Sequence, residues 1–232
     1  MRGKIIPFRG YMTAQRPGQS IPLETLQRSF SFHEISVGYD YLTQLPNGER
    51  EFMLGGAFTQ EGQEGSQAIA NTDDSTYSKR VTAHLAGVLP RYFGEDNWGR
   101  EGQPPEGDTS EWSKGRVKSA WSGIIGMSAD LLPWVGRLSP SVSGRLAPLN
   151  QSSPQGDGTM IPTAPGEWIA AGYTGEGMVQ AWMSGKALAE MILGREREGN
   201  VAEWFPDNMR VSTARWKKAK PTALLDYYFS ED

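Results

Sequence analysis

The 232-residue sequence contains no cysteine and only two histidines. Without cysteine there can be no disulfide bond, thiolate metal ligand, nucleophilic thiol or prosthetic group attached through a cysteine sulfur. This composition is consistent with a reducing compartment. Neither histidine accompanies a G-x-S-x-G nucleophile motif, and the two are not spaced i, i+4 for metal binding. A phosphate-binding G-x-x-x-x-G-K-[ST] loop is also absent. We therefore expect no hydrolase, kinase or metal site, and interpret His84 as a structural residue.

Long apolar runs and long basic runs are missing as well. No apolar stretch approaches the ~18 residues of a membrane span, and the start, "MRGKIIPFRGYM", is too short in apolar residues for a signal peptide. The net charge is −4. The longest basic run, "RWKKAK" at 215–220, is more typical of a solvated segment than of a nucleic-acid patch. We expect a cytoplasmic protein with no membrane and no nucleic-acid partner.

The first 138 residues are rich in β-forming residues. A strand is predicted over 4–14, and a hairpin over 37–58 around Asn47-Gly48, because Asn-Gly supplies the positive φ angles that tight turns need. An amphipathic helix is predicted within 71–94, with Tyr77, Val81, Leu85 and Val88 at helical spacing and Pro90 as its end. Strand-like sequence resumes over 116–138.

The remaining sequence contains one long loop and one strand–helix unit. Residues 139–165 are rich in Ser, Pro and Gly and predict a long polar insertion loop. Within 166–199 we expect a short strand at Trp168–Ala171 and a helix from 177 to 193. The apolar positions of this helix, which we expect to pack, are 178, 181, 182, 185, 188, 189 and 192. Residues 200–232 are predicted to be a surface tail, and the whole indicates an α+β fold.

The turn between this strand and helix reads "AAGYTGEGM", with glycines in the order G-x-x-G-x-G. Glycine lets the backbone approach a ligand closely, and the start of a helix offers unpaired N–H groups at the positive end of its dipole. Glu176 disfavours a pyrophosphate here, whereas a neutral acceptor that becomes anionic during a reaction would fit. The turn alone is equally consistent with a tight connection that binds nothing.

Four segments, in order over residues 4–194, resemble the FAD-dependent oxidoreductases related to D-amino-acid oxidase, sarcosine oxidase and glycine oxidase. "IIPFRGYM" is similar to the strand that re-enters after the family's FAD domain. "YDYLTQLPNGEREFMLGGAF" resembles its substrate-domain hairpin. "WSGIIGMSADLLPWVGRL" resembles its Trp-x-Gly…Asp-x-x-Pro-x-x-Gly block, and "GEWIAAGYTGEGM" with the helix that follows resembles its flavin-contacting segment.

The resemblance implies a domain organisation. Residues 1–138 would form an antiparallel substrate-domain sheet with a flanking helix, of which the first strand and 116–138 lead to and from the FAD domain. Residues 166–199 would be the C-terminal strand–helix unit of an FAD-binding α/β domain. The N-terminal Rossmann half of that domain is absent: the sequence has no βαβ unit, no G-x-G-x-x-G and no acidic residue for the ribose. A possible partner is therefore the missing FAD-binding half.

The resemblance also implies a cofactor and a reaction. FAD would bind at Gly172, Tyr173, Thr174, Gly175, Glu176, Gly177 and Met178, and at Arg9 and Gly10 of the first strand. The backbone from Tyr173 to Met178 would stabilise negative charge on the reduced flavin while a small-molecule amine or amino acid is oxidised to an imine. Tyr173, Tyr41 and Trp121 are the candidates for the catalytic, substrate-facing side, with aromatic core packing as the alternative role of Trp121.

The sequence departs from the family in one further place. Members that oxidise amino acids have an arginine just after the Gly of the Trp-x-Gly block, where this sequence has Ile124 and Ile125, so an amino-acid carboxylate lacks its bidentate partner. Arg9 or Arg137 could substitute. Three hypotheses remain: the C-terminal portion of an FAD-dependent amine or amino-acid oxidoreductase, a non-catalytic remnant or fragment of such an enzyme, and an unrelated module that binds a small ligand or sugar through its tryptophans and tyrosines.

Overall fold

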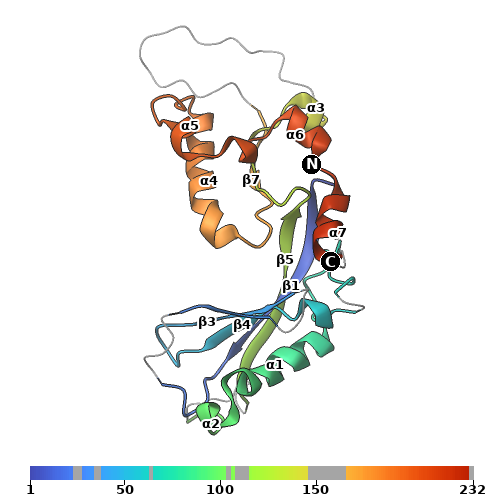
Figure 1. Cartoon of the computed structure of the whole chain (residues 1–232). Coiled ribbons are helices and arrows are strands. Elements are labelled where there is room, and N and C mark those ends of the chain that lie inside the picture. Colours follow the sequence, from blue (N-terminus) through green and yellow to red (C-terminus); the bar gives the residue numbers. More distant parts are fainter. Residues whose placement is uncertain are drawn as a thin grey trace. The chain divides into compact units, whose positions relative to one another are not determined.

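The chain forms two compact units, which are described separately. The computed structural model describes residues 1–22, 28–33, 38–62, 65–102, 106–107, 115–145 and 166–229. The first unit, Pro7–Ile124, is called the sheet unit, and the second, Met1–Ile6 with Ile125–Asp232, is called the turn unit. The chain passes between the two units within its first and fifth strands (Figure 1).

The described strands β1 to β5 form one sheet in the order β2-β3-β4-β1-β5. The register pairs Gln44 of β3 with Phe52 of β4, and Gln15 of β1 with the same phenylalanine. This antiparallel pairing confirms the predicted hairpin. Gly48 has a φ of 67° in its connecting turn, which is longer than a two-residue tight turn. The bounds are β1 Ile5–Gln15, β2 Phe30–Phe32, β3 Asp40–Gln44, β4 Phe52–Gly55 and β5 Val117–Ser128.

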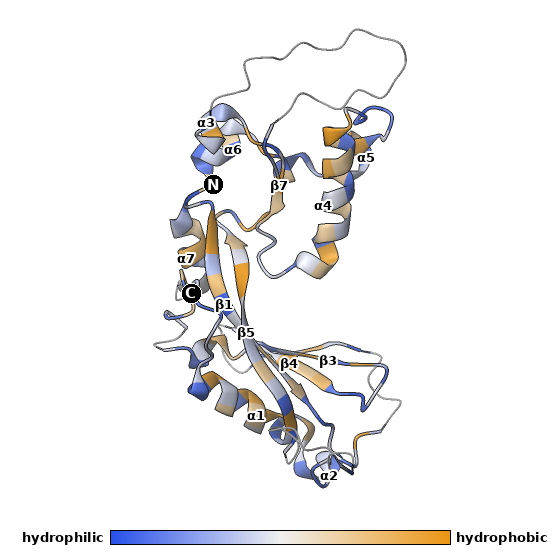
Figure 2. Cartoon of the chain, turned by 180° about the vertical axis from the view of Figure 1, so that it is seen from behind, coloured by the Kyte–Doolittle hydropathy of each residue, from blue (hydrophilic) through white to orange (hydrophobic). Residues whose placement is uncertain are grey.

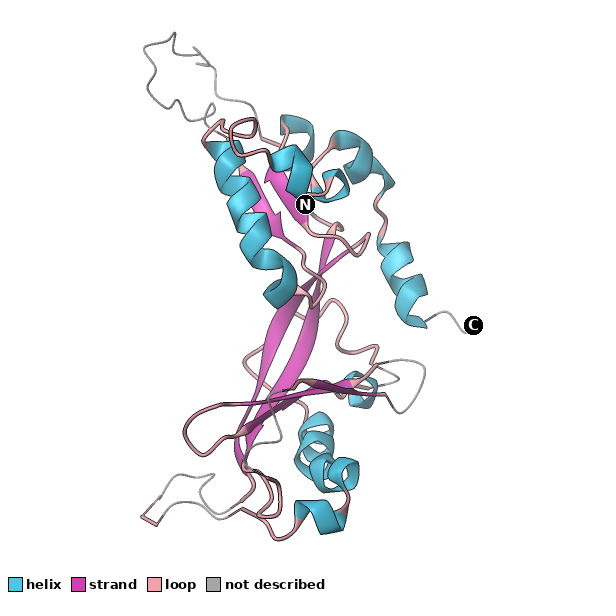
Figure 3. Cartoon of the chain, turned by 60° about the vertical axis from the view of Figure 1, so that its left-hand side comes forward, coloured by secondary structure: helices cyan, strands magenta, loops and turns pink. Residues whose placement is uncertain are grey.

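Helix α1 (Lys79–Phe93) packs on this sheet and completes the core of the sheet unit (Figure 3). Val81, Leu85, Val88 and Leu89 are buried against Leu42, Phe52 and Leu54, and complete burial of each such side chain stabilises the fold by about 1.5–3 kcal/mol. Two details of the sequence prediction were wrong. Tyr77 precedes the helix and is exposed, because Ser78 is the N-cap. Pro90 lies inside the helix, which continues to Phe93 because Tyr92 and Phe93 pack against the core of the sheet unit.

The turn unit is built around a two-stranded antiparallel sheet and one long helix. Strand β6 (Trp134–Arg137) pairs with β7 (Trp168–Ala171), so that Val135 lies opposite Ala170. Helix α4 (Gly177–Ile192) packs beside them through Ala187 and Met191. The predicted strand and helix of 166–199 are therefore confirmed in position.

Short helices complete both units. In the sheet unit these are η1 Phe58–Gln60 and α2 Glu95–Trp98. In the turn unit they are α3 Pro140–Ser143, α5 Val201–Trp204, η2 Asp207–Met209, α6 Thr213–Lys218 and α7 Pro221–Phe229. Most of the predicted insertion loop, residues 146–165, lies outside the described residues.

The described elements are a mixed α+β arrangement, as predicted, with a five-stranded antiparallel sheet, a two-stranded sheet and several helices. Within the described ranges, no helix is long and apolar enough to cross a membrane. The predicted roles of the domains in cofactor and substrate binding stay predictions.

Candidate functional site

The glycine turn, Gly172–Gly177, connects β7 to α4 and has a strongly bent backbone. Gly172, Thr174 and Gly175 have φ angles of 78°, 55° and 87°. A Cβ on Gly172 would lie 3.2 Å from Ile5, so glycine is required there both for its φ angle and for space. Thr174 tolerates the left-handed region because its amide donates to the Gly126 carbonyl at 3.2 Å and its Oγ1 accepts from Ser128 N at 3.0 Å.

The N-terminus of α4 presents backbone N–H groups beside this turn. The carbonyl of Glu176 accepts from Val179 and Gln180. Among the described residues, the N–H groups of Gly177 and Met178 make no recorded backbone hydrogen bond, as expected for the first turn of a helix. Apart from the adjoining backbone, no atom of the described residues lies within 4 Å of where a Cβ would stand on Gly175 or Gly177. A flat group could therefore approach these amides, and the dipole of the 16-residue helix favours negative charge there.

The face of α4 that was predicted to pack is largely exposed, so this prediction was wrong. Met178 is fully exposed, Trp182 is 84% exposed and Val179 is 74% exposed, whereas the buried residues are Ser184, Ala187 and Met191. The cause is that the helix is apolar around most of its circumference, and the two short strands of the turn unit cover only one side. The hydropathy colours of α4 show hydrophobic residues on this uncovered helix (Figure 2).

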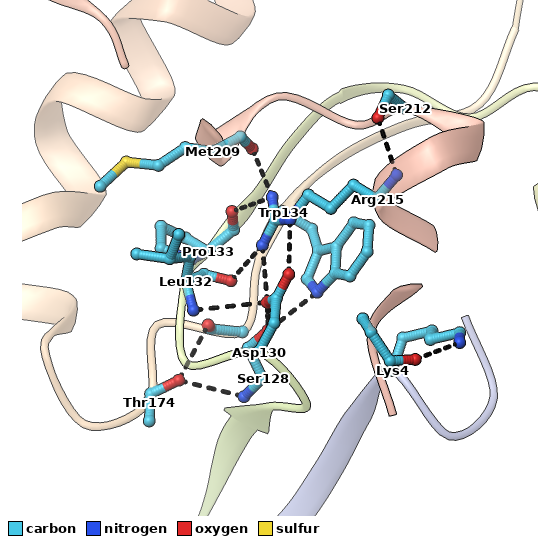
Figure 4. Close-up of polar contacts among 12 residues, drawn as sticks. Lys4, Ser128, Asp130, Leu132, Pro133, Trp134, Thr174, Met209, Ser212 and Arg215 are labelled. Carbon is cyan, nitrogen blue, oxygen red and sulfur yellow. Dashed lines mark hydrogen bonds and ion pairs between the residues drawn. The ribbon is translucent and has the colours of Figure 1, made fainter. Parts of the chain in front are cut away.

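The end of β5 contacts the glycine turn, because the Ser128 N–H donates to Thr174 Oγ1 (Figure 4). The Ser128 hydroxyl donates to Asp130 Oδ1 at 2.8 Å and accepts from Trp134 Nε1 at 2.9 Å. Burial raises the pKa of the Asp130 carboxyl. The hydrogen bonds from Arg215 and Ser128 and the positive charge of Arg215 outweigh the effect of burial, so the pKa lies below its usual value. Asp130 is therefore an ionised, hydrogen-bonded anchor at neutral pH.

The other candidate residues lie in the sheet unit. Tyr41 of β3 faces Gly55 of β4, where an added Cβ would lie 2.5 Å from the Tyr41 ring. Burial, followed by the charges of Tyr39 and Asp40, raises the pKa of Tyr41. Trp121 of β5 is 39% exposed. It is therefore not a core residue of this unit, and its alternative role in aromatic core packing is not supported.

Arg9 and Gly10 both belong to β1. The Arg9 guanidinium forms a 2.5 Å ion pair with buried Glu61, donates to the Asp73 carbonyl at 3.3 Å and lies over the Tyr11 ring. Arg9 is therefore already engaged within the sheet unit, and a ligand carboxylate would have to compete with Glu61.

Sequence analysis missed a buried polar cluster around Asp40. Asp40 Oδ2 accepts from His84 Nε2 and from the Tyr92 hydroxyl, each at 2.7 Å, and its Oδ1 accepts from Ala57 N at 2.6 Å. These residues line a cavity of about 370 Å³. His84 is held by a carboxylate, as a structural histidine would be. Its partner Asp40 lies 44 residues away in the sequence and on another element, so no spacing motif indicates this contact.

Sequence analysis also missed Arg215, which was interpreted as part of a solvated basic run. Its guanidinium binds Asp130 through two hydrogen bonds of 2.7 and 2.8 Å and lies 3.9 Å above the Trp134 ring. The structure thus brings together the glycine turn, Ser128, Asp130 and Arg215 within the turn unit. The association of this turn with Tyr41, Trp121, Arg9 and Gly10 stays a prediction. No group of three or more metal-ligating residues occurs in the part of the chain that the structure describes.

Comparison with known proteins gives one family. Residues 1–191 of the 232 match the family model DAO, described as FAD dependent oxidoreductase. The match includes the glycine turn and nearly all of α4, and ends before α5, α6 and α7. A search of curated proteins finds no match.

Proposed function

Because the chain belongs to the FAD-dependent oxidoreductase family, we propose that it is the flavin-facing and substrate-facing portion of an enzyme that oxidises an amine or amino-acid-like substrate. The observation that carries the proposal is the glycine turn. It combines a left-handed backbone, open space at Gly175 and Gly177, and the first N–H groups of a long helix. These features fit the pyrimidine edge of a flavin, which is flat and gains negative charge on reduction.

FAD, when bound, accepts the hydride that leaves the substrate carbon attached to the nitrogen. The chain's own contribution is electrostatic: the N–H groups of Gly177 and Met178 would stabilise negative charge at the helix N-terminus. The side chain of Glu176 makes no capping hydrogen bond to these groups in the described residues, which leaves them to a ligand. Tyr41 and Trp121 would line the substrate side. The Tyr41 phenol is protonated at neutral pH, as an ordinary tyrosine is, and burial raises its pKa further, so it would donate a hydrogen bond.

The arginines favour an amine over an amino acid as substrate. Arg9 is ion-paired with buried Glu61, and the guanidinium of Arg137 lies 5.9 Å from the centre of the Trp168 ring. Ile124 and Ile125 supply no charge where amino-acid-oxidising relatives have arginine. At Arg9, a substrate carboxylate would therefore have to replace the ion pair with Glu61, whereas an amine without a carboxylate would not.

We further propose that the ADP portion of FAD is held by another polypeptide segment, which carries the family's N-terminal FAD-binding half. The sequence has no G-x-G-x-x-G fingerprint for the pyrophosphate. The exposed face of α4, formed by Met178, Val179 and Trp182, is the surface that such a half would cover. A non-catalytic fragment or remnant of the family is the alternative, and it predicts no flavin binding even when that half is supplied.

Titration with two flavins tests the proposal. Riboflavin has the isoalloxazine ring but lacks the ADP portion, so the chain alone should quench the fluorescence of riboflavin and FAD with similar affinity. Gly177→Leu places a side chain in the open space before the amides and should weaken both flavins at least tenfold. Gly185→Leu is the matched control, since Gly185 is on the same helix and also has no neighbour within 4 Å of its Cβ position.

The family's FAD-binding half, supplied as a separate chain, provides the second part of the test. Its addition should tighten FAD binding far more than riboflavin binding and give a yellow complex with flavin absorbance bands. Colourless protein under these conditions, or equal effects of the two leucine variants on riboflavin binding by the chain alone, would refute the proposed flavin site.

A further inference from the structure

Every N–H donor of Arg215 is used within the turn unit. Nε and Nη2 bind the two carboxylate oxygens of Asp130. Nη2 also donates to the Leu132 carbonyl at 2.6 Å, and Nη1 donates to the carbonyls of Pro133 and Met209, each at 2.8 Å. A guanidinium has five N–H donors, so Arg215 is fully committed. It is also stacked on Trp134 (Figure 4).

These contacts connect two strained turns. Leu131, next to Asp130, has a φ of 65°, and Thr174 in the glycine turn has a φ of 55°. Non-glycine residues in this region cost about 1–3 kcal/mol each and persist only where their surroundings over-determine them. Arg215 holds the first turn from both sides of Leu131. It binds the Asp130 side chain before this residue and the carbonyls of Leu132 and Pro133 after it.

Ser128 carries the connection to the second turn. Its hydroxyl donates to Asp130, and its backbone N–H donates to Thr174 Oγ1 at 3.0 Å. Thr174 Oγ1 also lies 3.3 Å from the Gly172 carbonyl. Hydrogen bonds therefore run from Arg215 through Asp130 and Ser128 to the residue at the middle of the glycine turn.

We propose that Arg215 is a positioning residue for the glycine turn: through Asp130 and Ser128 it fixes Thr174 and so sets the direction of the first N–H groups of α4. The functional meaning of this direction rests on the proposed function, in which those groups face the flavin. Arg215 lies outside residues 1–191, so the positioning residue comes from a segment that the family model does not include.

Hydrogen exchange of the purified full chain tests the coupling without a cofactor. Arg215→Gln should increase amide exchange about tenfold in peptides that cover Ser128 and the glycine turn. Arg215→Lys keeps the charge but loses the planar fork and should give an intermediate effect. Lys217→Gln, an exposed change on the same helix, is the matched control and should leave the turn unchanged. Faster exchange confined to α6 and residues 130–134 would overturn the proposal.

A second pair of variants keeps the test valid if Arg215→Gln destabilises the whole turn unit. Thr174→Val removes the Oγ1 acceptor, whereas Thr174→Ser retains it. Valine should loosen the glycine turn while α6 stays protected, and combining it with Arg215→Lys should add no further loosening of the turn. Additive effects of the two substitutions would refute the connection through Ser128. Amides of α1 in the sheet unit serve as the internal reference.

Flavin binding separates this inference from the proposed function. With the FAD-binding half present, Arg215→Lys should weaken flavin binding several-fold and shift the visible absorbance bands, since the N–H groups would be misaligned. Wild-type protein without flavin binding refutes the proposed function, and the exchange experiment still tests the coupling. Bound flavin with unchanged affinity and spectrum in Arg215→Lys, despite a loosened turn, would refute the positioning role.

Discussion

Replacing Asp40 with alanine should destabilise the sheet unit strongly. The carboxylate is 4% exposed and accepts hydrogen bonds from His84, Tyr92 and the Ala57 amide. Removing it leaves three donors with no acceptor in a partly buried cluster, which corresponds to a loss of about 3–5 kcal/mol of unfolding free energy. Asp40→Asn retains an acceptor for the Ala57 amide and should lose less. Asp74→Ala, an exposed change in the same unit, should lie within about 0.5 kcal/mol of wild type.

Urea unfolding of the full chain, followed by circular dichroism, gives the overall change, and hydrogen exchange of α1 amides reports the sheet unit separately. The pH dependence supplies an independent check. Burial raises the pKa of Asp40, but hydrogen bonds from His84, Tyr92 and Ala57 outweigh it, so the folded pKa lies below the ordinary 3.8. The stability that Asp40 contributes is therefore complete above that value and is lost as pH falls through the lowered folded pKa.

The difference in stability between wild type and Asp40→Asn should accordingly narrow below about pH 4, since asparagine does not titrate. A loss below about 1 kcal/mol for Asp40→Ala, or a difference that stays constant into strong acid, would refute the assignment of Asp40 as an ionised buried anchor.

Three further predictions concern other parts of the chain. Gly55→Ala should destabilise the sheet unit by about 1–3 kcal/mol, because its Cβ would overlap the ring of Tyr41, whereas Gly87→Ala in α1 has open space and should stabilise it by about 0.5–1 kcal/mol in the same urea assay. Trp182→Gln should leave thermal unfolding of the chain nearly unchanged yet prevent assembly with the FAD-binding half, as gel filtration would show; unimpaired assembly would exclude this face. Glu61→Ala should cost about 3–5 kcal/mol, because it removes the carboxylate that pairs with the largely buried Arg9 guanidinium, and a calorimetric change near zero would contradict this.

The sequence was sufficient for features that depend on neighbouring residues. Asn47-Gly48 between two β-type runs predicted the hairpin, and the glycines from 172 to 177 predicted the strand-to-helix turn, because backbone conformation at these positions depends on local sterics. The order of four motifs likewise predicted the family. The end of α1 was misplaced because Tyr92 and Phe93, which follow Pro90, pack against the core of the sheet unit, and such packing is a tertiary property.

Only the tertiary structure identified which groups meet over long separations in sequence. Arg215 and Asp130 are 85 residues apart, and His84 and Asp40 are 44 apart. Their side chains are of types that usually lie in solvent, so composition alone favours a surface role for them. The exposed face of α4 follows the same logic: periodicity shows that the helix is apolar, but the neighbouring strands decide which side is covered. The sequence thus determined the local backbone and the family, and the packing of distant segments determined the polar networks and the uncovered surface.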